Sequence, residues 1–152
     1  MTKPVLFLDS SALFAGVFSP TGAARALLVL GEVGRISITI SEQVIAETER
    51  ALARKAPKAL PYYREALRHI GLRIVRDPST EDVAPHLGII RHEVDVPILV
   101  AAMNAGVDYL VTFNRRHFID DPSVSSRSGL QIGTPGDALN WLKGAGTLGG
   151  EV

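Results

Sequence analysis

Short apolar segments that suit buried β-strands alternate with longer helix-like segments along this chain of 152 residues. Neighbouring parallel strands must be joined by a crossover, which is usually a helix. The alternation therefore predicts an α/β fold of three α/β/α layers, with a central, mostly parallel sheet of about five strands. The strands are expected over residues 5–8, 36–40, 72–75, 108–113 and 130–132.

Helix signals occupy the intervals between these strands. Ser10 or Ser11 is expected to cap the first helix, and Ser41 to cap another. The clearest helix spans 95–105, where apolar residues recur at helical spacing and Gly106 suits the C-terminus. Further helices are expected over 23–30, 61–70 and 135–142 and from about 80 towards 91, with loops over 16–22 and 114–127.

The composition excludes several classes of protein. The 16 Lys and Arg residues balance 16 Asp and Glu residues, so the chain is not a nucleic-acid binder with a broadly basic surface. Cys is absent, which excludes a disulfide framework and a zinc–thiolate site. No apolar run approaches the ~20 residues that a membrane-spanning helix needs, so no membrane partner is expected.

The organisation of the chain suggests one domain. The first residues lead directly into a strand-like segment rather than a signal peptide, so a cytoplasmic location is expected. The length suits a single core, and no linker divides the sequence. We expect the domain over 1–142 and a flexible Gly-rich tail over 143–152.

Three carboxylates occupy positions that are costly for a charge. Asp9 ends the first strand, and ligands of parallel sheets bind beyond the carboxyl ends of the strands. Glu47 borders the apolar face of its helix, and Asp95 shares a helix face with apolar residues. The alternatives are ordinary ones: Asp9 as a loop acid or helix cap, Glu47 as the boundary of an amphipathic helix, and Asp95 as an N-cap.

If these carboxylates lie close together, their negative charges repel one another and must be neutralised. Two unit charges about 6 Å apart repel by roughly 3 kcal/mol at an effective dielectric of about 20. Either one carboxyl group stays protonated or a divalent cation neutralises the cluster. Oxygen ligands without Cys or paired His favour Mg²⁺ or Mn²⁺ over zinc, and such an ion can activate water.

Three segments resemble the motif blocks of PIN-domain nucleases. They are LDSSALFAG (8–16), SEQVIAETERAL (41–52) and DVPILVAAMNAGVDYLVTFNRRHF (95–118). The segment LQIGTPGDALNWL (130–142) is similar to the last strand and helix of that family. The resemblance covers nearly the whole chain, and it is closest in kind to the VapC-like toxins of toxin–antitoxin pairs.

The resemblance implies roles for individual residues. Asp9, Glu47 and Asp95 match the acidic catalytic and metal-binding positions, and Asn114 matches a fourth position where many relatives carry Asp. It implies Mg²⁺ or Mn²⁺ as the cofactor. Ser11 and Thr112 are predicted to orient carboxylates or waters, with capping or strand-end hydrogen bonding as the alternative. Arg115, Arg116 and His117 are candidates for holding substrate phosphates, with an exposed loop as the alternative.

The function that the resemblance implies is metal-dependent endoribonuclease activity, as the toxin of a toxin–antitoxin system. RNA is then the substrate, a cognate antitoxin is a partner, and homodimerisation is expected. The alternative is a catalytically weak PIN-like module that binds a partner protein or RNA, which the amide at Asn114 and the neutral net charge favour.

Two other site classes have less support. A phosphotransfer domain with a phosphoacceptor Asp9 would use a second nearby Asp, whereas Ser10 and Ser11 follow here. His69, His86 and His92 show no metal-ligand spacing and are expected to be surface or packing groups.

Overall fold

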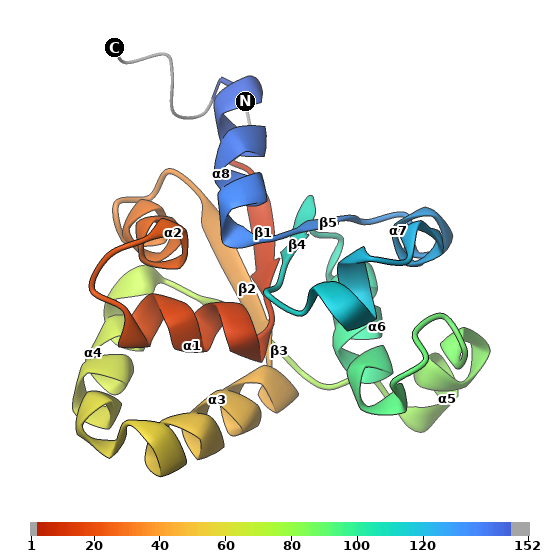
Figure 1. Cartoon of the computed structure of the whole chain (residues 1–152), viewed down its shortest axis with the longest axis horizontal. Coiled ribbons are helices and arrows are strands. Elements are labelled where there is room, and N and C mark those ends of the chain that lie inside the picture. The colour runs from red at the N-terminus through yellow and green to blue at the C-terminus, as the bar shows by residue number, and fades with distance from the viewer. Residues whose placement is uncertain (1–2, 147–152) are drawn as a thin grey trace.

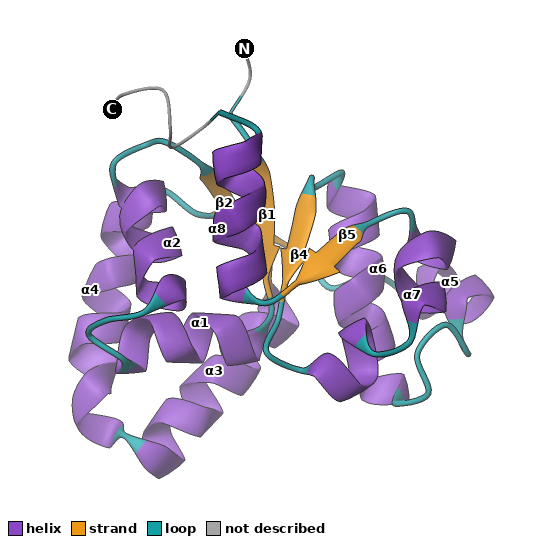
Figure 2. Ribbon diagram, turned by 45° about the horizontal axis from the view of Figure 1, so that its top comes forward, coloured by secondary structure: helices purple, strands orange, loops and turns teal. Residues whose placement is uncertain are grey.

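Five parallel strands form one sheet at the centre of the molecule, in the order β3-β2-β1-β4-β5. This computed structural model describes residues 3–146. The α/β/α prediction is confirmed, and helices lie on both sides of the strands in Figures 1 and 2. The strands are β1 (Val5–Leu8), β2 (Ser37–Ser41), β3 (Arg73–Val75), β4 (Tyr109–Val111) and β5 (Gln131–Gly133).

Eight α-helices connect and cover these strands in the described part of the chain. In Figure 1 the first four lie together on one side of the sheet, and the fifth to seventh lie on the other. The last helix contacts β4, β5 and the second helix. The helices are α1 (Ser10–Phe18), α2 (Ala23–Glu32), α3 (Glu42–Lys55), α4 (Leu60–Ile70), α5 (Thr80–Val83), α6 (Val96–Ala105), α7 (Pro122–Ser128) and α8 (Pro135–Gly144).

Short helical turns supplement the regular helices. The 3₁₀ turns are η1 (Pro57–Ala59), η2 (Ala84–His86) and η3 (Glu93–Asp95), and η4 (Arg115–Ile119) is a π-helical turn. Within residues 3–146, no single helix is long and apolar enough to cross a membrane. Only α1 and α2, bent by 88° against each other, reach that length and composition as a pair.

The start of α1 differs from the prediction. Its cap is Asp9 and not Ser10 or Ser11, because the Asp9 carboxylate accepts the Ala12 N–H. The helix also continues through Gly16, which was expected to begin a loop. A Cβ at Gly16 would lie 2.7 Å from Leu28 Cδ1 of α2, so this glycine serves close helix packing rather than a turn.

The segment after β4 also differs from the prediction. The loop expected over 114–127 contains η4 and α7, because Asn114 and Asp121 cap these turns and Pro122 fits the first turn of α7. The helix expected from about 80 towards 91 is limited to α5 and η2.

At the C-terminus, α8 extends two residues beyond the expected domain boundary, to Gly144. Ser41 caps α3, as predicted, and Thr134 caps α8. The tail expected over 143–152 falls partly in α8 and partly, over 147–152, outside the described residues.

The core lies around the two central strands. Leu6, Phe7 and Leu8 of β1 are almost fully buried, and α6 is buried over most of its length. Trp141 of α8 packs on Tyr109 of β4 with ring centroids 5.2 Å apart. This arrangement fixes the carboxyl ends of β1 and β4 beside each other.

Substitution of Gly106 tests the connection between α6 and β4. Gly106 ends α6 with a φ of 66°, and an added Cβ would meet no atom within 4 Å. Gly106→Ala should therefore lower the free energy of unfolding by about 1 kcal/mol through backbone strain alone. Gly144→Ala is the matched control, because this last residue of α8 has neither a left-handed φ nor a contact. Equal effects in urea denaturation would contradict this account.

Candidate metal and active site

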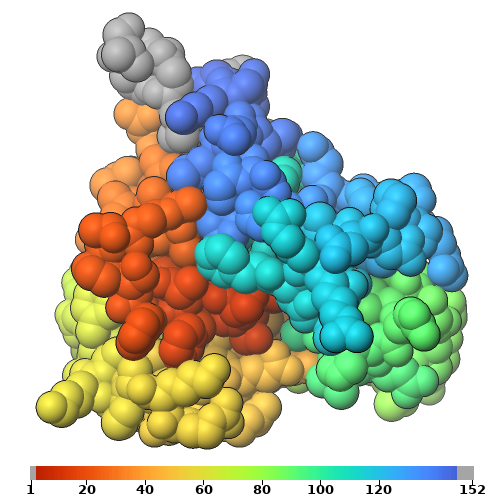
Figure 3. All heavy atoms as spheres, in the orientation of Figure 1, coloured from red at the N-terminus to blue at the C-terminus, as the bar shows by residue number. Residues whose placement is uncertain are grey.

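Parallel pairing of β1 and β4 brings distant parts of the sequence together. The register sets Leu8 beside Val111, and the N–H of Asp9 donates to the Val111 carbonyl at 3.1 Å. Asp9 and Thr112, 103 positions apart, are therefore neighbours at the carboxyl ends of their strands. Figure 3 shows α1, α3 and the segment after β4 adjoining on one face of the molecule.

Asp9 is a buried carboxylate, with only 4% of the residue exposed. Its Oδ1 accepts the Ser11 hydroxyl at 2.7 Å and the Ala12 N–H at 2.9 Å, and its Oδ2 accepts the Thr112 hydroxyl. Burial raises the pKa of Asp9, these hydrogen bonds oppose the rise, and the charge of Asp95 adds to it. A carboxylate has about four acceptor positions, so these three bonds leave about one for a further ligand.

Ser11 and Thr112 lie beside Asp9, where the prediction of an orienting role requires them. The Ser11 hydroxyl also accepts the Phe113 N–H at 3.0 Å, and the Thr112 hydroxyl accepts the Asn114 N–H at 2.9 Å. Each hydroxyl therefore connects Asp9 to the backbone that follows β4. The two side chains fix both oxygens of Asp9 relative to that segment.

Glu47 is held between residues adjacent to the other two carboxylates. Its Oε1 accepts the Ser10 hydroxyl at 2.8 Å, and its Oε2 accepts the Gln43 side-chain amide at 3.0 Å. The same amide donates to the Val94 carbonyl at 3.0 Å. Ser10 follows Asp9 and Val94 precedes Asp95, so α3 is tied to both segments.

Asp95 is at the N-cap position of α6, but its side chain does not cap the helix. It lies in η3, and its side chain makes no capping hydrogen bond. Instead Oδ2 lies 2.7 Å from Nδ1 of His117 and 3.2 Å from Nδ1 of His92. The side chain is 13% exposed. Asp95 is therefore a poorly solvated carboxylate whose contacts are side chains rather than a helix terminus.

Asn114 caps η4 and belongs to the same network. Its Oδ1 accepts the backbone N–H of His117 at 3.1 Å, and its Nδ2 lies 2.9 Å from the ring nitrogen Nδ1 of His117. Hydrogen bonds consequently run from Asp9 through Thr112 and Asn114 to the backbone N–H of His117, whose ring contacts Asp95.

Hydrogen bonds thus connect Asp9, Asn114 and Asp95, whereas Glu47 is joined to this network only through Ser10, which follows Asp9, and through Gln43, which contacts Val94. Among the described residues, one group of potential metal ligands has its ligand atoms within 4.8 Å of one another. It consists of His92, Asp95 and His117. His92, expected to be a surface or packing group, is exposed and stacks on His117, and its Nδ1 also contacts Asp95. Its position three residues before Asp95 was the signal for this contact, because a turn brings such residues together.

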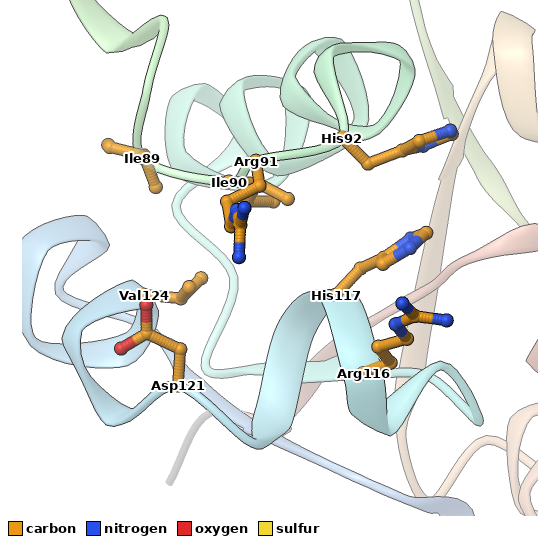
Figure 4. Close-up of a pocket in the computed structure, with 8 residues that line it drawn as sticks. All are labelled: Ile89, Ile90, Arg91, His92, Arg116, His117, Asp121 and Val124. Atoms are coloured by element: carbon orange, nitrogen blue, oxygen red, sulfur yellow. The ribbon is translucent and has the colours of Figure 1, made fainter.

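Arg115 and Arg116 are exposed beside this network. Arg116 lines a hollow of about 310 Å³ that also includes Arg91, His92 and His117. In Figure 4, Arg116, His92 and His117 project in the same direction from this hollow. Both predicted arginines therefore lie on accessible surface, and their contact with substrate stays a prediction.

Solved structures with the same fold include three with near-complete alignment. PAE2754 from Pyrobaculum aerophilum is 20% identical, with 93% of this chain and 90% of that chain covered and a TM-score of 0.55. VapBC2 from Rickettsia felis, bound to a DNA fragment from its promoter, is 18% identical. The alignment covers 86% of this chain and 98% of that chain, with a TM-score of 0.59. VapC20 from Mycobacterium tuberculosis, a toxin that cleaves the sarcin–ricin loop, is 16% identical, with coverages of 80% and 94% and a TM-score of 0.51.

Sequence comparison gives a more direct assignment. No curated protein matches the chain. The profile of the PIN domain matches residues 5–116, a range that includes every predicted site residue. This chain therefore belongs to the PIN-domain family.

Proposed function

We propose that this protein is a metal-dependent endoribonuclease that hydrolyses RNA phosphodiester bonds and serves as the toxin of a toxin–antitoxin pair. Membership of the PIN-domain family supports nuclease chemistry. The observation that carries the proposal is Asp9: a buried carboxylate whose pKa is raised by burial and by the charge of Asp95. Such a group costs stability unless a cation offsets it.

The residues present fit a hard divalent cation. Asp9, Glu47 and Asp95 supply carboxylate oxygens, and Asn114 supplies an amide oxygen, which are ligand types that Mg²⁺ and Mn²⁺ accept. Three carboxylates and one amide give a formal charge of about −3, which a divalent cation reduces. These four residues would hold the ion.

The chain's own side chains would prepare this site for phosphate chemistry. Ser11 and Thr112 fix Asp9, while Ser10 and Gln43 fix Glu47, so the ligands are oriented before binding. Arg115 and Arg116 would hold phosphates beside the acidic network. A bound divalent ion would supply water activation and would offset the charge that develops on the phosphate.

An antitoxin would cover apolar surface beside this site. Phe113 is 48% exposed and precedes Asn114, and Val94 is 56% exposed and precedes Asp95. A partner segment that shields these side chains would also block access to the carboxylates. FitAB, a neighbour of 15% identity and TM-score 0.56, was solved bound to a DNA fragment, as VapBC2 was. We infer by analogy an antitoxin partner and a homodimer.

The second candidate is a PIN-like module that binds a partner without efficient cleavage. The amide at Asn114 favours it, because one ligand charge is missing and the Asn114 side chain is engaged by His117. Partner binding without cleavage under any divalent metal would support this candidate over the nuclease.

Removal of single carboxylate charges tests the nuclease. Asp9→Asn and Asp95→Asn should each reduce Mn²⁺- or Mg²⁺-dependent cleavage of RNA by about 10²-fold or more, because metal ligands are lost while side-chain shape is kept. Cleavage is measured on single-stranded and structured RNA with purified protein. Asp82→Asn, in exposed α5, is the control and should keep full activity. Full activity in either site variant would refute the assignment.

The pH dependence of stability tests the burial of Asp9. Because its pKa is raised in the folded state from 3.8, stability falls as pH rises through that folded pKa. Asp9→Asn lacks this loss, so without divalent metal its Tm should exceed that of the wild type by roughly 3 °C or more at pH 8. The gap should close as the pH is lowered towards 4.

The same melting experiment includes a metal arm. Added Mn²⁺ should raise the Tm of the wild type and leave that of Asp9→Asn nearly unchanged, because only the folded wild type binds the ion. A Tm gap that does not depend on pH would contradict the electrostatic explanation.

A further inference from the structure

Two histidines face one carboxylate oxygen at the edge of the acidic network. Nδ1 of His117 and Nδ1 of His92 lie 2.7 Å and 3.2 Å from Oδ2 of Asp95. Their rings are stacked, with centroids 4.5 Å apart and planes inclined by 20°. Figure 4 shows both rings projecting the same way from separate segments. The three side chains therefore place two nitrogens and one oxygen within 4.8 Å of one another.

Nδ1 of His117 lies close to two polar groups of opposite character. Its Nδ1 lies 2.9 Å from the Asn114 amide nitrogen, which donates, and 2.7 Å from the Asp95 carboxylate, which accepts. The Asn114 side chain is held in this orientation because its Oδ1 accepts the backbone N–H of His117. Nδ1 either carries a proton or does not, so it satisfies only one neighbour. An unprotonated Nδ1 has one lone pair, which can bind either the Asn114 amide hydrogen or a cation held together with Oδ2 of Asp95.

The donor set favours a transition-metal ion over magnesium. Imidazole nitrogens are preferred by Zn²⁺ and its neighbours in the first transition series, whereas Mg²⁺ prefers oxygen. With zinc–ligand distances near 2.1 Å, tetrahedral ligands lie about 3.4 Å apart. The His92–Asp95 contact of 3.2 Å is close to this value, and the His117–Asp95 contact needs to open slightly. Three protein ligands leave a position for water.

We propose that His92, Asp95 and His117 form a binding site for a transition-metal ion of the zinc class, distinct from the four-residue oxygen site. The two sites share Asp95, so an ion at the histidines draws this carboxylate away from the oxygen ligands. If the proposed nuclease function holds, on which this consequence rests, Zn²⁺ at the histidine site inhibits Mg²⁺-dependent cleavage.

Metal binding is measured first, on the full chain and without RNA. Isothermal titration with Zn²⁺ and the visible absorption of bound Co²⁺ should show one equivalent in the wild type, in the presence of excess Mg²⁺. His92→Ala and His117→Ala should each weaken binding at least about tenfold. His69→Ala, a histidine of α4 outside the cluster, should bind like the wild type. Circular dichroism confirms that each variant is folded.

The outcomes separate this site from the proposed nuclease. Unchanged Zn²⁺ affinity in His92→Ala, or no stoichiometric binding in the wild type, overturns the histidine site whether or not the protein cleaves RNA. Retained Zn²⁺ binding in Asp9→Asn supports a distinct site, whereas its loss overturns that distinction. In a cleavage assay, Zn²⁺ should inhibit the wild type and inhibit His92→Ala at least about tenfold less strongly. Equal inhibition of both overturns the role of the histidines in inhibition.

Discussion

Burial of the Asp9 carboxylate is the constraint on which the rest of the site depends. The residue ends a central strand, caps α1 and accepts hydrogen bonds from Ser11 and Thr112, so its position cannot shift without disturbing two elements. Burial and the charge of Asp95 nevertheless raise its pKa. The fold therefore holds a negative charge where the apolar surroundings oppose it. A site of this kind is stabilised when a cation binds, which links folding to metal binding.

The parallel sheet explains how this constraint reaches residues far apart in the sequence. Pairing of β1 with β4 brings Thr112 to Asp9, and Thr112 passes the connection to Asn114 through a second hydrogen bond. Glu47 is different, because it lies on a helix and reaches the site through Ser10 and Gln43 rather than through strand register. Backbone pairing thus sets part of the site, and side-chain hydrogen bonds set the remainder.

The sequence predicts the residues at strand ends better than the contacts between segments. The five strands, the cap at Ser41 and the end of α6 at Gly106 follow from local pattern, and the structure confirms them. Local pattern failed at Gly16, where the glycine serves packing against Leu28, a contact with another helix. It failed again over 114–127, where capping by Asn114 and Asp121 turns a polar segment into helical turns.

Asp95 shows why residue type and spacing were insufficient at the site itself. An acid at the start of a helix is ordinarily explained by capping, and that explanation would have removed the residue from any functional argument. The Asp95 side chain makes no hydrogen bond to the first turn of α6, because its carboxylate contacts His92 and His117 instead. The interaction with His117 depends on η4, which the sequence did not predict, so the environment of Asp95 follows only from tertiary structure. Asp95 contacts the ring nitrogens of His92 and His117 directly and is connected to Asn114 only through His117. Because both proposed metal sites include this carboxylate, competition for it would determine which cation is bound.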